Sequence, residues 1–276
     1  MQKTEKFIRF CVKTVMRISK WLEEHRIRVY ASQASFFIII SAVPMLIMIL
    51  ALSAYFLPSA EQMHSLIAGV LPEELSSIAK KLLVEISEKS NLSLLSVSAI
   101  TLLWSASRGV RGIGAGIRNV YGTDKEKHYI IYILKSAALT LLYICSVILA
   151  LIVWVFGDMI LSGMSDGAPI GALKVLNGSA LFLLLSAVFM LTYRMFGARK
   201  GEQIKETPGA FFSAAGWFLF SAGFEYYVEH FGRYSYVYGS LASLIVVMLW
   251  LYSCMEILLI GAGINLLLSR KRRAVQ

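Results

Sequence analysis

The chain has 276 residues, of which 57% are hydrophobic and only 16% are charged, and its mean hydropathy is +0.67. Soluble domains usually carry about 25% charged residues, so this composition excludes an ordinary soluble protein and predicts an all-α, polytopic membrane protein. The net charge of +10 could indicate an acidic partner, and the positions of the basic residues decide whether one is needed.

Residues 1–33 form a basic segment with the pattern of an amphipathic helix. Apolar residues recur every three or four positions, with lysines and arginines between them. They are Phe7, Cys11, Val15, Ile18 and Leu22. The segment is predicted to lie at the membrane interface, against anionic phospholipid headgroups on the cytoplasmic side. Packing against the underside of the helix bundle is an equally good interpretation.

Six apolar stretches follow, and each is predicted to be a transmembrane helix because about 20 apolar residues cross a bilayer. They occupy about 34–57, 92–107, 129–156, 175–196, 209–227 and 240–268. Together they make one domain over 34–268, which leaves a basic tail at 269–276. Residues 61–90, between the first two spans, have helical periodicity and predict one or two short helices on the exterior side.

The first span contains Pro44, with Gln33 just before it. Proline removes a backbone hydrogen bond, so it should bend the helix and free a carbonyl. Bent helices with polar groups often line solute paths, although a proline in a membrane helix is also common without such a role.

A glycine-rich stretch, GVRGIGAGIRNVYG at 109–122, follows the second span. Its spacing does not fit the dinucleotide-binding motif G-x-G-x-x-G, and it follows a membrane span rather than a strand. Gly112 and Gly116 instead form a G-x-x-x-G pair, which lets two helices approach closely. The segment is predicted to be a small-residue helix or a re-entrant element at the cytoplasmic mouth. Arg108 and Arg111 would either snorkel to headgroups or bind an anionic solute.

Glu256 is the clearest ionisable residue inside a predicted span, with more than ten mostly apolar residues on either side. Such groups are expensive in lipid and are functional candidates. Tyr252 lies one turn earlier, so the carboxyl is either satisfied by that hydroxyl or part of a proton or cation site. Glu225, Glu229 and His230 could form a metal site, but a solvated helix end is the better interpretation, and we expect neither a metal nor a cofactor.

The number of lysines and arginines is high and low in turn in successive segments outside the predicted spans. Eight lie before the first span, five in 108–128, four in 194–207 and four after Leu268, against three, one and one in 59–91, 157–174 and 225–239. This is the positive-inside pattern, which predicts both termini in the cytoplasm and an even number of crossings, in agreement with the six apolar stretches. The excess of positive charge is thereby explained without a nucleic-acid partner.

Three blocks of the sequence resemble the YihY/BrkB family of bacterial membrane proteins, once labelled ribonuclease BN. They are ASQASFFIIISAVPMLIMIL at 31–50, LLWSASRGVRGIGAGIRNVYG at 102–122 and YSYVYGSLASLIVVMLWLYSCMEILLIGAGINLLL at 234–268. The matching residues are Trp104, Ser105, Arg108, Asn119, Tyr121, Tyr238, Gly239, Trp250, Tyr252, Gly261 and Asn265. Where many members have Gly-Ala-Glu, this chain has Gly261, Ala262 and Gly263, and its carboxylate stands two turns earlier at Glu256.

The resemblance implies a transporter of unsettled substrate, and it implies that the ribonuclease label is a misassignment. The residues agree with dropping that label, because the four histidines are scattered and metal-dependent hydrolysis needs clustered ligands. We therefore expect a non-enzymatic transport or translocation protein without a nucleotide motor, acting on an anionic solute or lipid, and able to form a homo-oligomer. The alternatives are a membrane scaffold that organises envelope proteins and, less favoured, a membrane-bound nuclease.

The candidate pathway is formed by polar side chains that would line a cavity between helices. They are Gln33, Arg108, Arg111, Asn119 and Glu256. A second group is expected to serve helix packing or bending, and consists of Pro44, Gly112, Gly116 and Gly261.

Overall fold

The computed structural model describes residues 16, 19–56, 92–123, 129–164, 170–197, 205–231 and 241–273. All regular secondary structure in this part of the chain is helical. The long helices are α2 (Ile27–Phe56), α5 (Leu92–Tyr121), α6 (Tyr129–Met164), α7 (Ile170–Gly197), α8 (Thr207–Phe231) and α10 (Leu241–Arg273). Each contains one of the six predicted spans.

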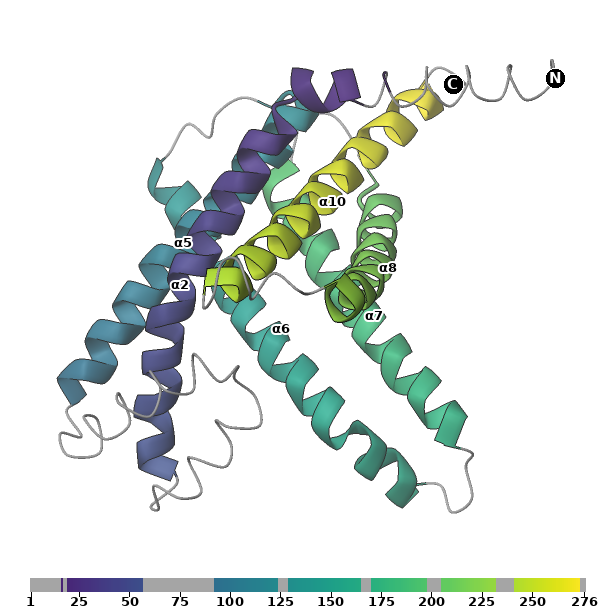
Figure 1. Cartoon of the computed structure of the whole chain (residues 1–276). Coiled ribbons are helices and arrows are strands. Elements are labelled where there is room, and N and C mark those ends of the chain that lie inside the picture. Colours follow the sequence, from purple (N-terminus) through teal and green to yellow (C-terminus); the bar gives the residue numbers. More distant parts are fainter. Residues whose placement is uncertain are drawn as a thin grey trace.

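The six long helices form a bundle (Figure 1). α2 lies along α5, α6 pairs with α7, and α10 crosses α8 while also contacting α2 and α5. The α2/α5 pair and the α6/α7 pair diverge toward the lower end of Figure 1, whereas all six helices meet toward the upper end.

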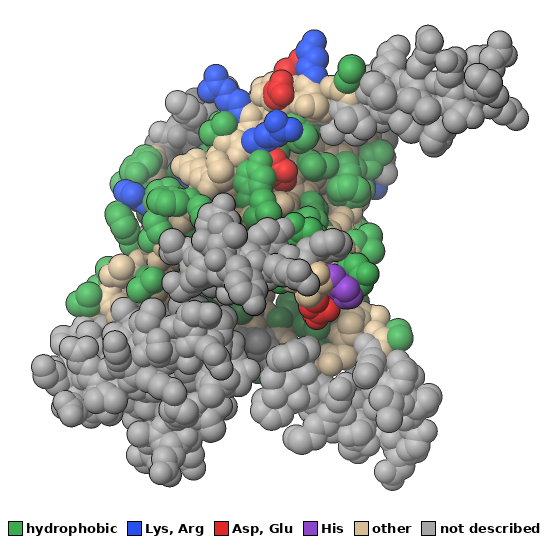
Figure 2. Space-filling model, in the orientation of Figure 1, with side chains coloured by type: hydrophobic (Ala, Val, Ile, Leu, Met, Phe, Trp, Pro, Cys, Tyr) green, Lys and Arg blue, Asp and Glu red, His purple; other side chains and the backbone are tan. Residues whose placement is uncertain are grey.

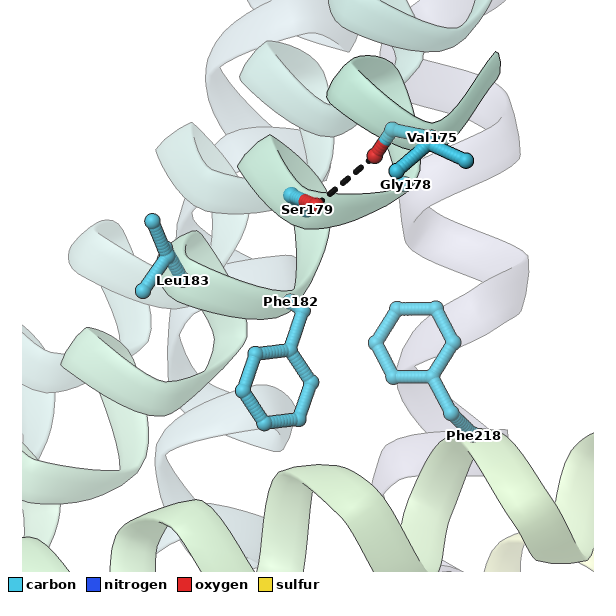
Figure 3. Close-up of a pocket in the computed structure, with 6 residues that line it drawn as sticks. All are labelled: Val175, Gly178, Ser179, Phe182, Leu183 and Phe218. Atoms are coloured by element: carbon cyan, nitrogen blue, oxygen red, sulfur yellow. Dashed lines mark hydrogen bonds between the residues drawn. The ribbon is translucent and has the colours of Figure 1, made fainter. Parts of the chain in front are cut away.

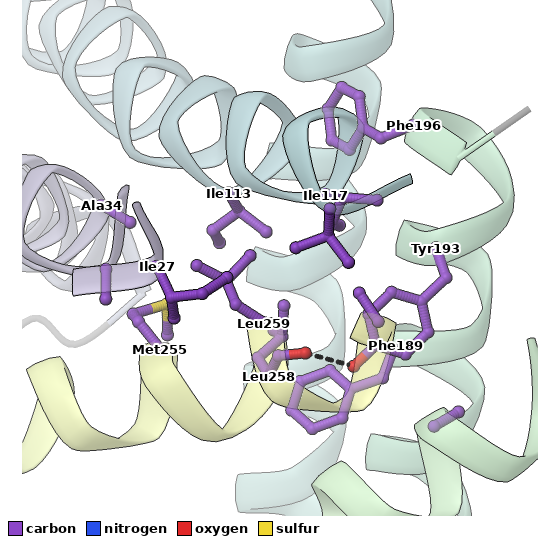
Figure 4. Packing of buried hydrophobic residues seen from close by; sticks show 14 of the residues in the cluster. Ile27, Ala34, Ile113, Ile117, Phe189, Tyr193, Phe196, Met255, Leu258 and Leu259 are labelled. Atoms are coloured by element: carbon purple, nitrogen blue, oxygen red, sulfur yellow. Dashed lines mark hydrogen bonds between the residues drawn. The ribbon is translucent and has the colours of Figure 1, made fainter. Parts of the chain in front are cut away.

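Buried residues gather where the helices meet. The core takes its side chains from the first half of α2, α6 and α8, from the second half of α5 and α7, and from α10 between Leu251 and Leu266. Figure 4 shows Ile27 of α2 beside Met255 of α10, with Ile117 of α5 facing Phe189 and Tyr193 of α7. The charge count predicts that these helix ends are the cytoplasmic ones, so the core lies in the half of the bundle predicted to be inner.

The outward faces of the helices are strongly apolar. Leu219 is 75% exposed, Ile130 is 72% exposed and Val175 is 71% exposed. Apolar patches of this extent are rare on soluble monomers, and they suit lipid contact. Figure 2 shows Lys and Arg side chains near the upper end of the molecule, with hydrophobic side chains around and just below them.

Four helices contain stretches long and apolar enough to cross a membrane: Ile27–Met45, Tyr129–Ala150, Val175–Gly197 and Leu244–Arg270. Helices α5 and α8, with 30 and 25 residues, have the length for a crossing but carry more glycine, serine, aromatic or charged residues. The structure therefore supports a membrane protein with at least these four apolar helices. Residues 61–90, which are predicted to lie on the exterior side, and residues 1–15, 17 and 18 of the N-terminal segment lie outside the described residues.

The helix bounds differ most from the predicted spans in α2 and α5. α2 begins at Ile27, seven residues before the predicted start, after a turn at His25 and Arg26 in which Arg26 has a φ of 48°. α5 continues without a break to Tyr121, fourteen residues past the predicted end. The glycine-rich stretch is thus the second half of a long helix, and it is not re-entrant.

The α2/α5 contact depends on glycine. A Cβ on Gly109 would lie 2.8 Å from Ile38 Cγ1, and a Cβ on Gly112 would lie 3.2 Å from the backbone nitrogen of Ala34. A Cβ on Gly116 would lie 3.0 Å from Tyr30 Cβ and 2.7 Å from a methyl of Leu259 in α10. The G-x-x-x-G pair therefore serves close packing, as its spacing indicates.

Two more features of the packing concern α10 and α2. A Cβ on Gly261 would lie 2.6 Å from the Tyr193 hydroxyl and 2.7 Å from the Gly209 carbonyl, so α10 and α8 touch through their backbones. Pro44 is buried and lies inside α2, which continues through it to Phe56.

Candidate functional site

Glu256 is held by two partners. The Tyr252 hydroxyl donates a hydrogen bond of 2.6 Å to Glu256 Oε1, and Arg28 Nε of α2 lies 3.9 Å from the same oxygen. The Glu256 side chain is 23% exposed and that of Arg28 is 55% exposed. The tyrosine was predictable from its position one turn earlier. The arginine was not, because it comes from a helix 228 positions away.

The ion pair fixes the level of Glu256 in the bundle. In the sequence Glu256 is near the middle of the apolar stretch Leu244–Arg270. Its partner Arg28, however, is in the first turn of α2, at the edge of the apolar stretch Ile27–Met45. α10 crosses the bundle at an incline (Figure 1), so a residue in its middle reaches the end of α2. Glu256 is therefore level with a helix end, which the sequence reading did not anticipate.

Arg108 is exposed on α5, and its guanidinium stacks on aromatic rings. The guanidinium carbon is 4.1 Å from the centroid of Trp104 and 5.5 Å from that of Phe37 on α2. Such cation–π contacts hold the plane of the group while its N–H edges remain able to donate.

Arg118, in the last turn of α5, also stacks on aromatic rings. Its guanidinium carbon is 4.2 Å from the Tyr132 centroid and 5.8 Å from that of Phe196. The Tyr132 hydroxyl donates a hydrogen bond of 2.7 Å to the backbone carbonyl of Arg111. Arg111 itself is half-buried. The sequence analysis did not single out Arg118, although its spacing of seven from Arg111 places both on one face of a helix.

The remaining pathway candidates do not meet in a shared cavity. Gln33 is exposed on α2, and Asn119 is exposed at the end of α5, where its amide donates a hydrogen bond of 2.5 Å to the carbonyl of His25. Asn119 thus joins the end of α5 to the turn before α2. Glu256 belongs instead to the contact between α10 and α2.

A buried polar network joins four helices, and sequence reasoning missed it. The Tyr193 hydroxyl donates to the Leu258 carbonyl at 2.6 Å, as Figure 4 shows, and lies 2.8 Å from the Ser213 hydroxyl. Asn265 accepts a hydrogen bond of 2.6 Å from the Gly209 N–H and donates one of 3.3 Å to the Tyr121 hydroxyl. The Gly209 N–H is in the first turn of α8, where helices lack internal acceptors, so Asn265 caps that helix.

The described part of the N-terminal segment packs on this core. Trp21 and Leu22 lie against the buried cluster, and a Cβ on Gly263 would fall on the Trp21 ring. Of the two interpretations of this segment, packing under the bundle is the one that these residues show.

Other candidate sites offer less. Glu225 and Glu229 are exposed and His230 stacks on Tyr226, and no group of three His, Cys, Asp or Glu residues that could hold a metal is found in the described ranges. A groove of about 540 Å³ opens between α7 and α8 (Figure 3). Phe182, Leu183 and Phe218 make it largely apolar, so it lacks the polar groups that would select a solute.

Comparison with known proteins assigns the chain to a family. The family described as virulence factor BrkB matches residues 18–276. The chain belongs to the virulence factor BrkB family. This match confirms the resemblance seen in the three sequence blocks, and it includes all six long helices.

Several relatives of this BrkB-family protein are membrane proteins by name. The ribonuclease-like protein YfkH of Bacillus subtilis is 30% identical over 248 residues, which cover 88% of this chain and 90% of YfkH. A UPF0761 membrane protein of Vibrio vulnificus is 31% identical over 90 residues, or 33% of this chain and 29% of its own length. Another, from Tolumonas auensis, is 48% identical over 40 residues, or 14% of this chain and 13% of its own length. No solved structure matches.

Proposed function

We propose that this BrkB-family protein moves an anionic solute or lipid across the bacterial cell membrane without a nucleotide motor. It crosses the membrane six times with both termini in the cytoplasm, and its basic ends contact anionic headgroups. The observation that carries the proposal is the pair of Glu256 and Arg28 between α10 and α2. An ionisable group in an apolar helix is a functional candidate, and Glu256 lies in the apolar stretch of α10, level with the end of α2 that is predicted to face the cytoplasm.

The pair is suited to a step in transport. A half-exposed arginine and a carboxylate at 3.9 Å make a weak contact that can open, because exposed ion pairs contribute only about 0–1 kcal/mol. Tyr252 keeps the carboxylate oriented toward α2 through its shorter hydrogen bond. Opening of the pair would free Arg28 for an anion and would let α2 move relative to α10.

Reconstitution in liposomes tests this proposal. Wild-type protein is expected to move radiolabelled inorganic phosphate inward or to expose NBD-labelled phosphatidylglycerol of the inner leaflet to dithionite. Glu256→Gln is expected to lower the rate of the active probe by about tenfold or more, about 1.4 kcal/mol, because the neutral side chain can no longer re-form the charged pair with Arg28 after each opening. Protein-free liposomes set the background.

Glu229→Gln is the matched control, because Glu229 is an exposed carboxylate at the far end of α8. It should leave the rate unchanged. A rate equal to wild type in Glu256→Gln would remove Glu256 from the mechanism. Movement of neither probe by wild-type protein would contradict transport of phosphate-bearing anions.

A further inference from the structure

One face of α5 carries a line of arginines that the ion pair does not use. Trp104, Arg108, Arg111, Ala115 and Arg118 are spaced by four, three, four and three residues, and each is exposed or half-buried. This spacing keeps side chains on one face of a helix. We call Arg108, Arg111 and Arg118 the arginine stripe. The opposite face of α5 enters the core through Val110, Ile113, Ile117 and Val120.

Contacts with α2 show how far the arginine stripe extends into the bundle. At its Arg118 end, the neighbouring Asn119 bonds the carbonyl of His25, just before α2 begins. At its other end, Arg108 stacks on Phe37. Phe37 is ten residues beyond Ile27, about 15 Å along the helix, and so near the middle of the apolar stretch Ile27–Met45.

The arginine stripe has no acidic partners among the residues that the structure describes. The ion pairs found there are Lys20 with Glu24 and Arg28 with Glu256. Aromatic rings support Arg108 and Arg118 instead. Arginine keeps its charge in proteins, and a charge at the middle of the hydrocarbon layer is expensive unless it is compensated. An anion that reaches this face would supply that compensation.

The form of the arginine side chain selects the kind of anion. A guanidinium presents a planar fork of N–H donors that matches two oxygens of a phosphate, and a ring under its face leaves this edge free. We infer that the arginine stripe of α5 binds the phosphate group of an anionic ligand between the inner edge and the middle of the bilayer. This inference rests on the proposed function and names the chemical group recognised.

Binding to the full-length chain in detergent tests the inference apart from transport. The probes are inorganic phosphate, dioleoyl phosphatidic acid, and dioleoylglycerol as the same lipid without phosphate, each followed by native mass spectrometry or equilibrium dialysis. Arg108→Gln with Arg118→Gln is expected to weaken phosphate-dependent binding by about tenfold for each arginine, the usual scale of a charge-assisted contact. Arg108→Gln alone, on an exposed residue, provides a milder variant if the double variant does not fold.

The matched control is Arg194→Gln with Lys205→Gln, which removes two exposed charges at the same end of the bundle. It should bind like wild type. Preference for phosphatidic acid over both other probes identifies a lipid headgroup, and competition by inorganic phosphate identifies a soluble anion; either result supports the inference. Equal losses in the two double variants, or equal binding of dioleoylglycerol, would overturn it.

The two proposals fail differently. Binding that depends on Arg108 and Arg118, without movement of either probe in liposomes, leaves the phosphate site and removes transport. Movement that depends on Glu256 but is unchanged by loss of Arg108 and Arg118, together with unchanged binding, keeps transport and removes the site.

Discussion

Asn265 shows how one polar residue can tie together helices that are distant in the sequence. Its amide oxygen caps the first turn of α8 at Gly209, and its amide nitrogen reaches Tyr121 at the end of α5. The residue is 1% exposed, so bulk solvent does not reach either bond. The sequence marks Asn265 only as part of a family pattern, because its partners lie 56 and 144 positions away.

Asn265→Leu should lower the stability of the folded protein by about 1–3 kcal/mol, the cost of a buried donor left without an acceptor. The thermal midpoint in detergent, followed by size-exclusion chromatography, measures the effect. Asn177→Leu on α7 is the matched control, because the Asn177 side-chain oxygen has no hydrogen-bond partner in the described part of the chain. Equal midpoints for the two variants would show that the cap contributes nothing.

Gly261→Ala tests the backbone contact of α10 with α8. The added Cβ would fall on the Ser213 hydroxyl and lie within 2.7 Å of Tyr193 and Gly209, so the helices must separate. Overpacking of this kind costs about 1–3 kcal/mol, which should appear as a lower thermal midpoint. Gly223→Ala on α8, where nothing lies within 4 Å, should instead be neutral or slightly stabilising because alanine favours helix.

Among the helices, α5 differs most from its prediction, because it ends fourteen residues later than the sequence indicated. The predicted span ended at residue 107 because arginines and glycines follow. The structure continues the helix to Tyr121, since these glycines allow α2 to approach closely and the arginines stay on the outward face. The G-x-x-x-G spacing and the Tyr252–Glu256 contact are local patterns and were predictable. The pairing of Arg28 with Glu256 was not, since periodicity describes one helix and not how another crosses it.

Gly112→Leu should separate α2 from α5, because its Cβ would already lie 3.2 Å from the Ala34 backbone. We expect a loss of about 1–3 kcal/mol and a lower thermal midpoint. Gly178→Leu makes the same change on α7, where nothing lies within 4 Å of the added Cβ. If both variants melt at the wild-type temperature, the glycine contact does not hold the two helices together.

For the whole molecule, the described helices and the sequence pattern give different numbers of membrane crossings. Among the described helices, length and hydropathy mark four as able to cross the membrane, whereas the apolar stretches and alternating charge of the sequence predict six. α8 distinguishes these topologies because it is one of the two less apolar helices and has exposed residues at both of its ends. The sequence could predict six helical segments from hydrophobicity, but it could not predict that their buried residues gather at one end of the bundle.

Lys205→Cys and Glu229→Cys mark the two ends of α8 at exposed positions. In a chain whose three native cysteines are replaced by serine, a membrane-impermeant maleimide should label Glu229→Cys in intact cells. It should label Lys205→Cys only after permeabilisation, because the positive-inside pattern puts that end in the cytoplasm. Labelling of both from the same side would contradict six crossings.

The glycines along α5 also determine which way its arginines point. Gly109 and Gly112 each follow directly after an arginine, so the contact with α2 sets the rotational phase of the helix as well as its distance. One residue inserted between Trp104 and Arg108 would not change the position of the arginines relative to the glycines. It would turn Trp104 by about 100° around the helix axis, away from Arg108. Arg108 would then lose the Trp104 ring while keeping its direction and the Phe37 ring of α2, which makes support and orientation of the guanidinium separable in one chain.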